Sequence, residues 1–202
     1  MNPAESAADP VTLDDVLAAR QRIAPYLPVT PLYGWPGLAR RLGCDYFLKH
    51  ENHQPTGAFK VRGGVNLVAA ASDEERARGF IAVSTGNHGQ SLAYACRQFN
   101  ASLTVITPLA NNPDKNRAIR GWGADLVEHG HDFDAAREYC ERLATERGLR
   151  YVHSANEPHL IAGVATWAIE VLEQGPPPEV LLVPIGLGSS AAGAALAMAW
   201  RS

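Results

Sequence analysis

The chain has 202 residues, and its 18 lysines and arginines against 21 aspartates and glutamates give a net charge of −3. This mildly acidic balance, without a block of basic residues, argues against a nucleic-acid-binding protein. Hydrophobic residues make up 46% and charged residues 19%, which excludes a mainly disordered chain, and no apolar run is long enough to span a membrane. We therefore expect a globular protein with no membrane span and no nucleic-acid partner.

The spacing of apolar residues predicts the secondary structure in chain order. Thr12 can cap a first helix that reaches Ile23, and the prolines that follow end it. A short strand at 46–49 and a helix at 59–71 come next. Beyond these we expect strands at 80–84, 103–107, 125–129, 151–153 and 180–185, which alternate with helices at 90–99, 113–120, 133–147, 160–174 and 191–200.

Alternation of strands and helices with short connections predicts the α/β fold class, with a mainly parallel sheet and flanking helices. The segment 180–185, VLLVPI, is apolar throughout, so we expect it to be a strand that is buried on both faces. Gly148 suits the left-handed position that ends the helix at 133–147.

The cysteines and histidines predict neither a disulfide framework nor a metal site. Cys44, Cys96 and Cys140 are too few and too widely spaced for either. His129 and His131 have a spacing that occurs among metal ligands, but no carboxylate or cysteine partner is identifiable nearby. The first ten residues lack the basic and apolar regions of a secretory signal. We therefore expect a cytoplasmic protein without a metal ion.

Three segments carry candidate chemistry, and each follows the end of a predicted strand, where open α/β sheets bind ligands. In ENHQPTGAFKVRGG (51–64), Lys60 lies near a helix start, where the helix dipole and partial burial lower the pKa of an amine and make it a nucleophile toward carbonyls. STGNHGQ (84–90) offers backbone N–H groups and uncharged side chains to an anion such as a carboxylate. GLGSSAAG (186–193) has small residues that let a phosphate approach the backbone closely.

Each of these segments taken singly has a plain structural interpretation: a solvated lysine, a capped turn and a close contact between a helix and a strand. Together they supply an amine that captures an aldehyde, a seat for a carboxylate and a seat for a phosphate. This combination is what pyridoxal phosphate chemistry requires.

The three segments resemble the fold-type II pyridoxal-phosphate enzymes, which have a tryptophan synthase β-like fold, and specifically the threonine/serine dehydratase and serine racemase-like group. ENHQPTGAFKVRGG resembles the Schiff-base lysine segment of that group, STGNHGQ its asparagine loop and VPIGLGSSAAG its phosphate-binding loop. The resemblance covers most of the chain from about Thr30 onward. It implies part of a large cofactor-binding domain, formed by 1–75 and 156–202, and a small α/β domain at 76–155.

The resemblance also implies a role for each matching residue. Lys60 is expected to be the catalytic lysine, which carries pyridoxal 5′-phosphate and then removes the Cα proton of an amino acid. The implied activity is deamination of L-threonine, L-serine or a related β-hydroxy amino acid to a 2-oxo acid and ammonia, by a homodimer. The implied cofactor-binding residues are Phe59, Lys60, Asn87, Gly186, Leu187, Gly188, Ser189 and Ser190, and the implied substrate-binding residues are Ser84, Thr85, Gly86 and His88.

Departures from the pattern of the group leave alternatives open. Thr85 stands where the racemases of the group carry a serine base, which disfavours racemisation, and Leu187 replaces a glycine of the phosphate loop. Family members continue beyond the point that corresponds to Ser202, so we expect a C-terminally truncated chain with an incomplete large domain and without the partner of the pyridine nitrogen. A β-replacement enzyme of the cysteine synthase type and a truncated, non-catalytic fragment are the alternatives.

Overall fold

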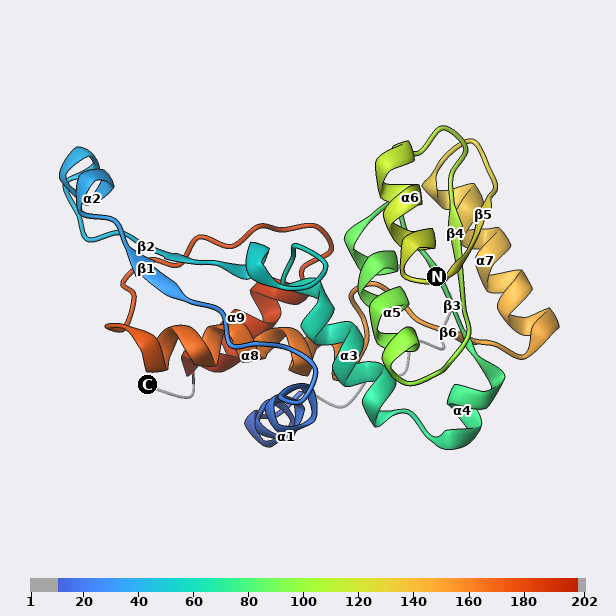
Figure 1. Ribbon diagram of the computed structural model, residues 1–202, viewed down its shortest axis with the longest axis horizontal. Coiled ribbons are helices and arrows are strands. Elements are labelled where there is room, and N and C mark those ends of the chain that lie inside the picture. The colour runs from blue at the N-terminus through green and yellow to red at the C-terminus, as the bar shows by residue number, and fades with distance from the viewer. Residues whose placement is uncertain (1–10, 200–202) are drawn as a thin grey trace, which may run out of the picture.

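The computed structural model describes residues 11–199. Figure 1 shows two groups of elements: a parallel sheet with helices on both of its faces, and a set of long helices from which a two-stranded hairpin projects. Among the described residues, none of the helices combines the length and the apolar character that a membrane span needs.

The larger sheet has four parallel strands in the order β5-β4-β3-β6. All four residues of the central strand β3 are buried, because helices cover both faces of the sheet. Phe80 and Ala82 pack on one face with α5 and α6, whereas Ile81 and Val83 pack on the other face with α7. The α/β class predicted from the sequence is therefore confirmed. The elements are α4 (Asp73–Arg78), β3 (Phe80–Val83), α5 (Asn87–Gln98), β4 (Leu103–Thr107), α6 (Pro113–Gly121), β5 (Asp125–Glu128), α7 (Phe133–Arg147) and β6 (Arg150–Tyr151).

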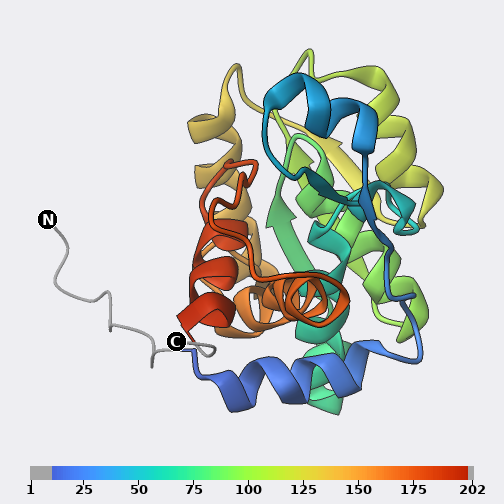
Figure 2. The ribbon, with the colours of Figure 1, turned by 90° about the vertical axis from the view of Figure 1, so that its left-hand side faces the viewer.

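The second group is built around α8 (Pro158–Gln174), which contacts α1 (Leu13–Ile23), α3 (Lys60–Ala70) and α9 (Ser189–Ala199). In Figure 2, α8 is seen nearly end-on, with α9 beside it and α1 crossing below. Glycines, among them Gly63, Gly163 and Gly193, allow the close approach of the helices. A Cβ on Gly163 of α8 would lie 2.5 Å from the carbonyl oxygen of Arg62 on α3, and a Cβ on Gly193 of α9 would lie 2.9 Å from the Cα of Ala165 on α8.

The hairpin consists of β1 (Leu32–Gly34) and β2 (Phe47–Lys49), which pair antiparallel on either side of α2 (Pro36–Leu42), and it continues into the short 3-10 helix η1 (Glu51–His53). Of these elements, only β2 was predicted from the sequence. Elsewhere in the chain, α4 was also not predicted. β1, α2 and η1 are too short to show a period of apolar residues, so the pattern on which the prediction rests cannot detect them.

The strand predicted at 180–185 is wrong. In the described part of the chain this segment has no strand partner, and Val180 and Leu182 are 77% and 85% exposed. An apolar run indicates a segment suited to a buried strand, but a strand also needs neighbours for its backbone N–H and C=O groups. Among residues 11–199 no strand pairs with this segment, although Leu181 and Val183 pack against the core.

Three helices also begin at other residues than the sequence predicted. α5 begins at Asn87, three residues before the predicted start, because the hydroxyl of Ser84 accepts a hydrogen bond from the backbone N–H of Gly89 and so caps the helix from a distance. α8 and α9 each begin two residues early, with Pro158 in the first turn of α8. The capping residue Thr12 and the left-handed Gly148 are confirmed.

Candidate active site

A cavity of about 350 Å³ lies where the carboxyl end of β3 meets the N-terminal ends of α3, α5 and α9. Every residue that the sequence analysis selected for a catalytic, cofactor or substrate role lines this cavity. A second hollow, of about 510 Å³, is lined by residues such as Arg78, Leu149 and Tyr151 and contains none of them. That hollow lies at the amino ends of β3 and β6, whereas ligands of open α/β sheets bind at the carboxyl ends.

Lys60 is the first residue of α3, and its side chain reaches across the cavity. Its Nζ donates hydrogen bonds to the carbonyl oxygen of Ser154 at 3.0 Å and to the Oγ of Ser189 at 2.6 Å. Burial lowers the pKa of Lys60 to about 8, so an appreciable fraction of the amine is neutral near neutral pH. Nζ also lies 6.0 Å from the centre of the Phe59 ring. This amine is therefore suited to act as a nucleophile and as a base.

The turn from Ser84 to His88 joins β3 to α5. The Ser84 Oγ accepts hydrogen bonds from the backbone N–H groups of Gly86 at 3.1 Å and Gly89 at 2.9 Å, so this hydroxyl shapes the turn. The first-turn N–H groups of α5 and the positive end of its dipole lie at the cavity. The turn can bind an anion such as a carboxylate.

His88 is 6% exposed, and its Nε2 lies 3.3 Å from the carbonyl oxygen of Val152. Because a carbonyl only accepts, Nε2 carries the proton, and Nδ1 is left as an acceptor that has no hydrogen-bond partner among residues 11–199. Burial, together with the positive charge of Lys60, lowers the pKa of His88 to about 3. His88 is therefore neutral at physiological pH and can accept a hydrogen bond but supplies no charge.

The loop that precedes α9 forms the third wall of the cavity. Gly188 has a φ of +96°, a conformation that favours glycine, and α9 begins directly after it at Ser189. The Oγ of Ser190 is buried and finds no hydrogen-bond partner in the described part of the chain. Leu187 is 62% exposed, so its side chain leaves the backbone of the loop accessible. A helix N-terminus with an unpartnered hydroxyl fits a phosphate group.

Residues 23–202 match the sequence model of a family described as pyridoxal-phosphate dependent enzyme. The chain belongs to this family. Its cofactor is therefore pyridoxal 5′-phosphate, as the sequence predicted. The recognised resemblance to fold-type II pyridoxal-phosphate enzymes is confirmed by the relatives and structures below.

The chain is similar to L-threonine ammonia-lyase of Thermotoga maritima, with 37% identity over 188 residues, which are 93% of this chain and 47% of that protein. It is also 37% identical, over 186 residues, to L-threo-3-hydroxyaspartate ammonia-lyase of Saccharomyces cerevisiae, covering 92% of this chain and 57% of that protein. The structure of maize serine racemase superposes with a TM-score of 0.91 at 29% identity, over 95% of this chain and 58% of that chain. The chain thus spans about half the length of these relatives.

The residues of the cavity fit pyridoxal phosphate as a chemical group. The amine of Lys60 can bond to an aldehyde, and the unpartnered Ser190 hydroxyl lies at a helix N-terminus suited to the phosphate. Among the described residues that line the cavity, Lys60 and Lys115 carry a positive charge and none is an aspartate or glutamate. This charge balance suits a ligand with a phosphate and a carboxylate.

Sequence reasoning missed Lys115, Phe133 and Ser154, which also line the cavity. The Nζ of Lys115 lies 3.3 Å from the position that a Cβ on Gly86 would take, so the side chain of Lys115 lies against the turn between β3 and α5. One signal could have found it. The segment NPDKN follows the strand at 103–107, and carboxyl ends of neighbouring parallel strands meet at one edge of a sheet.

Proposed function

We propose that this chain carries the cofactor and substrate site of a pyridoxal-phosphate-dependent ammonia-lyase. The reaction converts L-threonine, L-serine or a related β-hydroxy amino acid to a 2-oxo acid and ammonia. The observation that carries the proposal is the amine of Lys60, half-buried and held 2.6 Å from the first residue of the helix that offers a phosphate seat. The names of the two ammonia-lyase relatives support the reaction type.

The cofactor would be held by residues from each wall of the cavity. Lys60 would bond to its aldehyde carbon, and the loop at 186–190 would bind its phosphate, with the Ser190 hydroxyl as an extra donor. Phe59 would lie against the ring, and Asn87 would donate to the phenolic oxygen. When bound, pyridoxal phosphate supplies an electron sink that makes the Cα–H bond of an amino acid acidic.

The chain's own groups then position the substrate and move its proton. We propose that Ser84, Thr85, Gly86 and His88 form the seat of the substrate carboxylate, with the turn's N–H groups as donors. Once the substrate's amine has taken the place of Lys60 on the cofactor, the freed Nζ of Lys60 would take the Cα proton as general base, and burial, which lowers the pKa of the free amine to about 8, would favour its neutral form. The neutral His88 accepts a hydrogen bond at Nδ1 and leaves the proton transfer to Lys60.

The test is the visible absorbance of the purified 202-residue chain with added pyridoxal phosphate, compared with Lys60→Ala. We expect a band from the cofactor bound to Lys60 that is present in the parent, absent in the variant and shifted by L-threonine or L-serine. Ammonia and a 2-oxo acid should then form with the parent only. A sulfide-dependent product in their place would favour β-replacement, and no band in the parent would favour a non-catalytic fragment.

The domain organisation remains a prediction. We propose a large cofactor-binding domain formed in part by 1–75 and 156–202 and a small domain at 76–155. The larger sheet supports this division, because all four of its strands lie within 76–155 and α5, α6 and α7 flank it; α5 also packs against α3 of the proposed large domain (Figure 1).

We also propose that the protein is a homodimer in the cytoplasm. Tyr33, Trp35 and Phe47 of the hairpin region are 43–49% exposed, and such apolar side chains suit an interface between protein surfaces. The three cysteines are free thiols, which fits a reducing compartment. Light scattering of the chain after size-exclusion chromatography measures the oligomeric state, and a monomer at micromolar concentration would contradict the dimer.

A further inference from the structure

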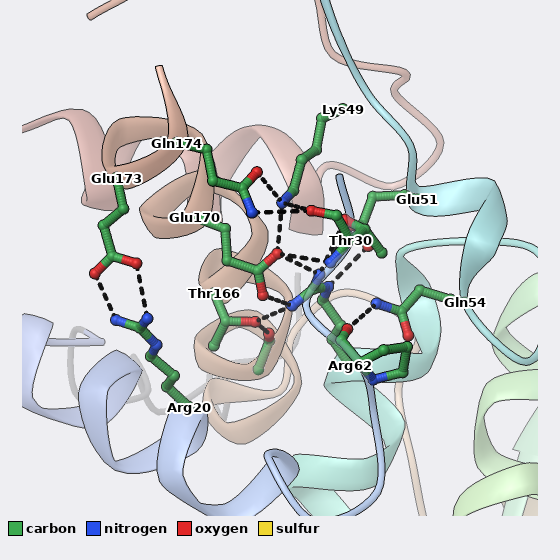
Figure 3. A network of polar contacts seen from close by, with 12 residues as sticks. Arg20, Thr30, Lys49, Glu51, Gln54, Arg62, Thr166, Glu170, Glu173 and Gln174 are labelled. Carbon is green, nitrogen blue, oxygen red and sulfur yellow. Dashed lines mark hydrogen bonds and ion pairs between the residues drawn. The ribbon is translucent and has the colours of Figure 1, made fainter. Parts of the chain in front are cut away.

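Four charged side chains meet in the interior between the hairpin and the long helices, outside the cavity (Figure 3). Arg62 lies on α3, Glu170 on α8, Glu51 on η1 and Lys49 on β2. Their side chains are 1%, 4%, 14% and 7% exposed, respectively. We refer to these four residues as the four-charge cluster.

Arg62 is the centre of the cluster and makes two bidentate contacts. Its Nη1 and Nη2 donate to the two carboxylate oxygens of Glu170 at 2.6 and 2.9 Å, and its Nε and Nη2 donate to those of Glu51 at 2.8 Å each. Nη1 also donates to the hydroxyl of Thr166 at 3.2 Å. Lys49 Nζ completes the cluster by donating to Glu170 at 2.6 Å. Two positive and two negative charges therefore balance.

Stability alone does not account for this arrangement. Removing charges from water is costly, and a buried ion pair is often no more stabilising than apolar side chains of the same volume. What such a cluster does provide is a defined geometry, because a two-armed contact between guanidinium and carboxylate fixes both distance and orientation. The question is which part of the molecule needs that geometry.

The cluster fixes the chain on both sides of Lys60. Arg62 lies two residues after Lys60, in the first turn of α3, and Glu51 lies nine residues before Lys60. Their bidentate contact therefore closes the loop that carries Phe59 and ends at Lys60. On the other side, Glu170 ties Arg62 to α8, the helix on which α9 packs through the contact of Gly193 with Ala165. The start of α9 is Ser189, the residue that accepts the hydrogen bond from Lys60.

We propose that the four-charge cluster is a positioning device that holds Lys60 Nζ in the narrow space between Ser154 and Ser189. Arg62 and Glu170 are then positioning residues that act through α3 and α8, since neither lines the cavity. The catalytic role of Lys60 Nζ rests on the proposed function, whereas the placement of Nζ by the four-charge cluster does not.

Loss of the cluster has a measurable consequence at Lys60. The pKa of Lys60 is lowered to about 8 by burial, with no charged group as a cause. The cluster is neutral as a whole, so it acts on Lys60 through packing and not through its electric field. If the start of α3 loosens, water reaches Nζ and the pKa rises toward its ordinary value of about 10.4.

The experiment is competitive acetylation of lysine amines with acetic anhydride across pH 6–11, without cofactor, read by mass spectrometry of peptides. The chain contains three lysines, Lys49, Lys60 and Lys115, and the exposed Lys115 is the internal reference. The main variant is the double substitution Arg62→Met with Glu170→Leu, which removes one charge of each sign and restores apolar volume. We expect its Lys60 labelling midpoint to rise by about one pH unit or more from the parent value near 8.

The matched control is Glu173→Gln. Glu173 lies on α8, as Glu170 does, and pairs with Arg20 of α1 at 2.6 and 2.7 Å, but both side chains are about 40% exposed (Figure 3). Breaking this surface pair should leave the Lys60 midpoint unchanged. A control variant that moves the midpoint as far as the double variant would overturn the proposal, because any damage to α8 would then have the same effect.

Thermal unfolding of each variant separates position from stability. The double variant could unfold at a lower temperature and still keep the midpoint of Lys60 labelling near pH 8. That result would mean that the cluster only stabilises the fold, and it would overturn the proposal. If the double variant does not fold, Arg62→Lys takes its place, because it keeps the charge and loses the two-armed geometry; a raised midpoint then supports the proposal and an unchanged one overturns it. Because neither cofactor nor substrate is added, failure of the proposed function leaves this result intact.

Discussion

The two walls of the cavity that can bind anions are built from the same kind of part, a helix N-terminus, but in different surroundings. The turn from Ser84 to His88 follows β3, whose residues are all buried between helices. The loop at 186–188 follows a segment in which Val180, Leu182 and Ile185 are 71–85% exposed. The comparison teaches that an apolar run becomes a buried strand only where neighbouring strands and helices are in place.

The hydroxyl groups of the two walls differ in the same way. Ser84 Oγ is engaged by two backbone N–H groups of its own turn, whereas Ser190 Oγ is buried without a partner among residues 11–199. The serine hydroxyl of the first wall is therefore satisfied without a ligand. The second presents an unmet hydrogen-bonding group, as expected for a wall whose partner is a ligand.

The largest difference between the walls should appear on truncating an apolar side chain in each. Ile81→Ala in β3 should lower the free energy of unfolding by about 2–5 kcal/mol, because the side chain is fully buried against α7. Leu182→Ala should change it by less than about 0.5 kcal/mol, because Leu182 is 85% exposed. Urea unfolding measures both. Equal losses would contradict the comparison, since they would mean that 180–185 is as well packed as β3.

The serine hydroxyls give the next largest effect. Ser84→Ala should cost about 1–3 kcal/mol of stability in the chain alone, because the N–H groups of Gly86 and Gly89 lose their acceptor. Ser190→Ala should cost nothing in the chain alone but should weaken the binding of pyridoxal phosphate. Unfolding curves with and without the cofactor separate the two roles. A Ser190→Ala variant that loses stability without cofactor would show that its hydroxyl is already bonded.

Lowering the pH should reduce the free energy of unfolding through His88, because the pKa of His88 is much lower in the folded chain than in the unfolded chain. Its pKa is about 3 in the folded chain and about 6.5 when unfolded, so between these values the unfolded chain binds the proton and the folded chain does not. The stability that neutral His88 contributes is present above pH 6.5 and is lost as the pH falls toward 3, by at most about 1.4 kcal/mol per pH unit.

His88→Asn should therefore make the free energy of unfolding less sensitive to pH between 6.5 and 4. The control is His131→Asn, because the side chain of His131 is 86% exposed. Denaturant unfolding at three pH values tests both variants. If the parent and His88→Asn lose stability in parallel, the histidine is not held neutral in the folded chain.

The smallest expected effect concerns Lys115. Lys115→Gln should raise the KM for an amino-acid substrate several-fold and leave kcat nearly unchanged, because a positive charge beside the carboxylate seat is removed. Arg117→Gln is the control, since Arg117 pairs with Asp114 on the exposed face of the same helix and does not line the cavity. An unchanged KM at low salt would show that Lys115 plays no part in substrate binding.

What the sequence by itself determined is local in origin. The helix from Thr12, the strand–helix alternation after Phe80 and the turn residue Gly148 follow from hydrogen bonds and apolar spacing within a few residues. The motif residues could be selected for the same reason, because each motif lies at a predicted strand end or helix start, and all of them line one cavity. Their individual roles stay predictions.

What only the tertiary structure decided depends on residues that are distant in the chain. The contact of Lys60 with Ser189 joins positions 129 residues apart, and that of Arg62 with Glu170 joins positions 108 apart. No local pattern encodes such pairs, because they form only when α8 brings α3 and α9 together. The failure of the strand at 180–185 has the same physical reason, since strand pairing requires a neighbour and not only an apolar sequence.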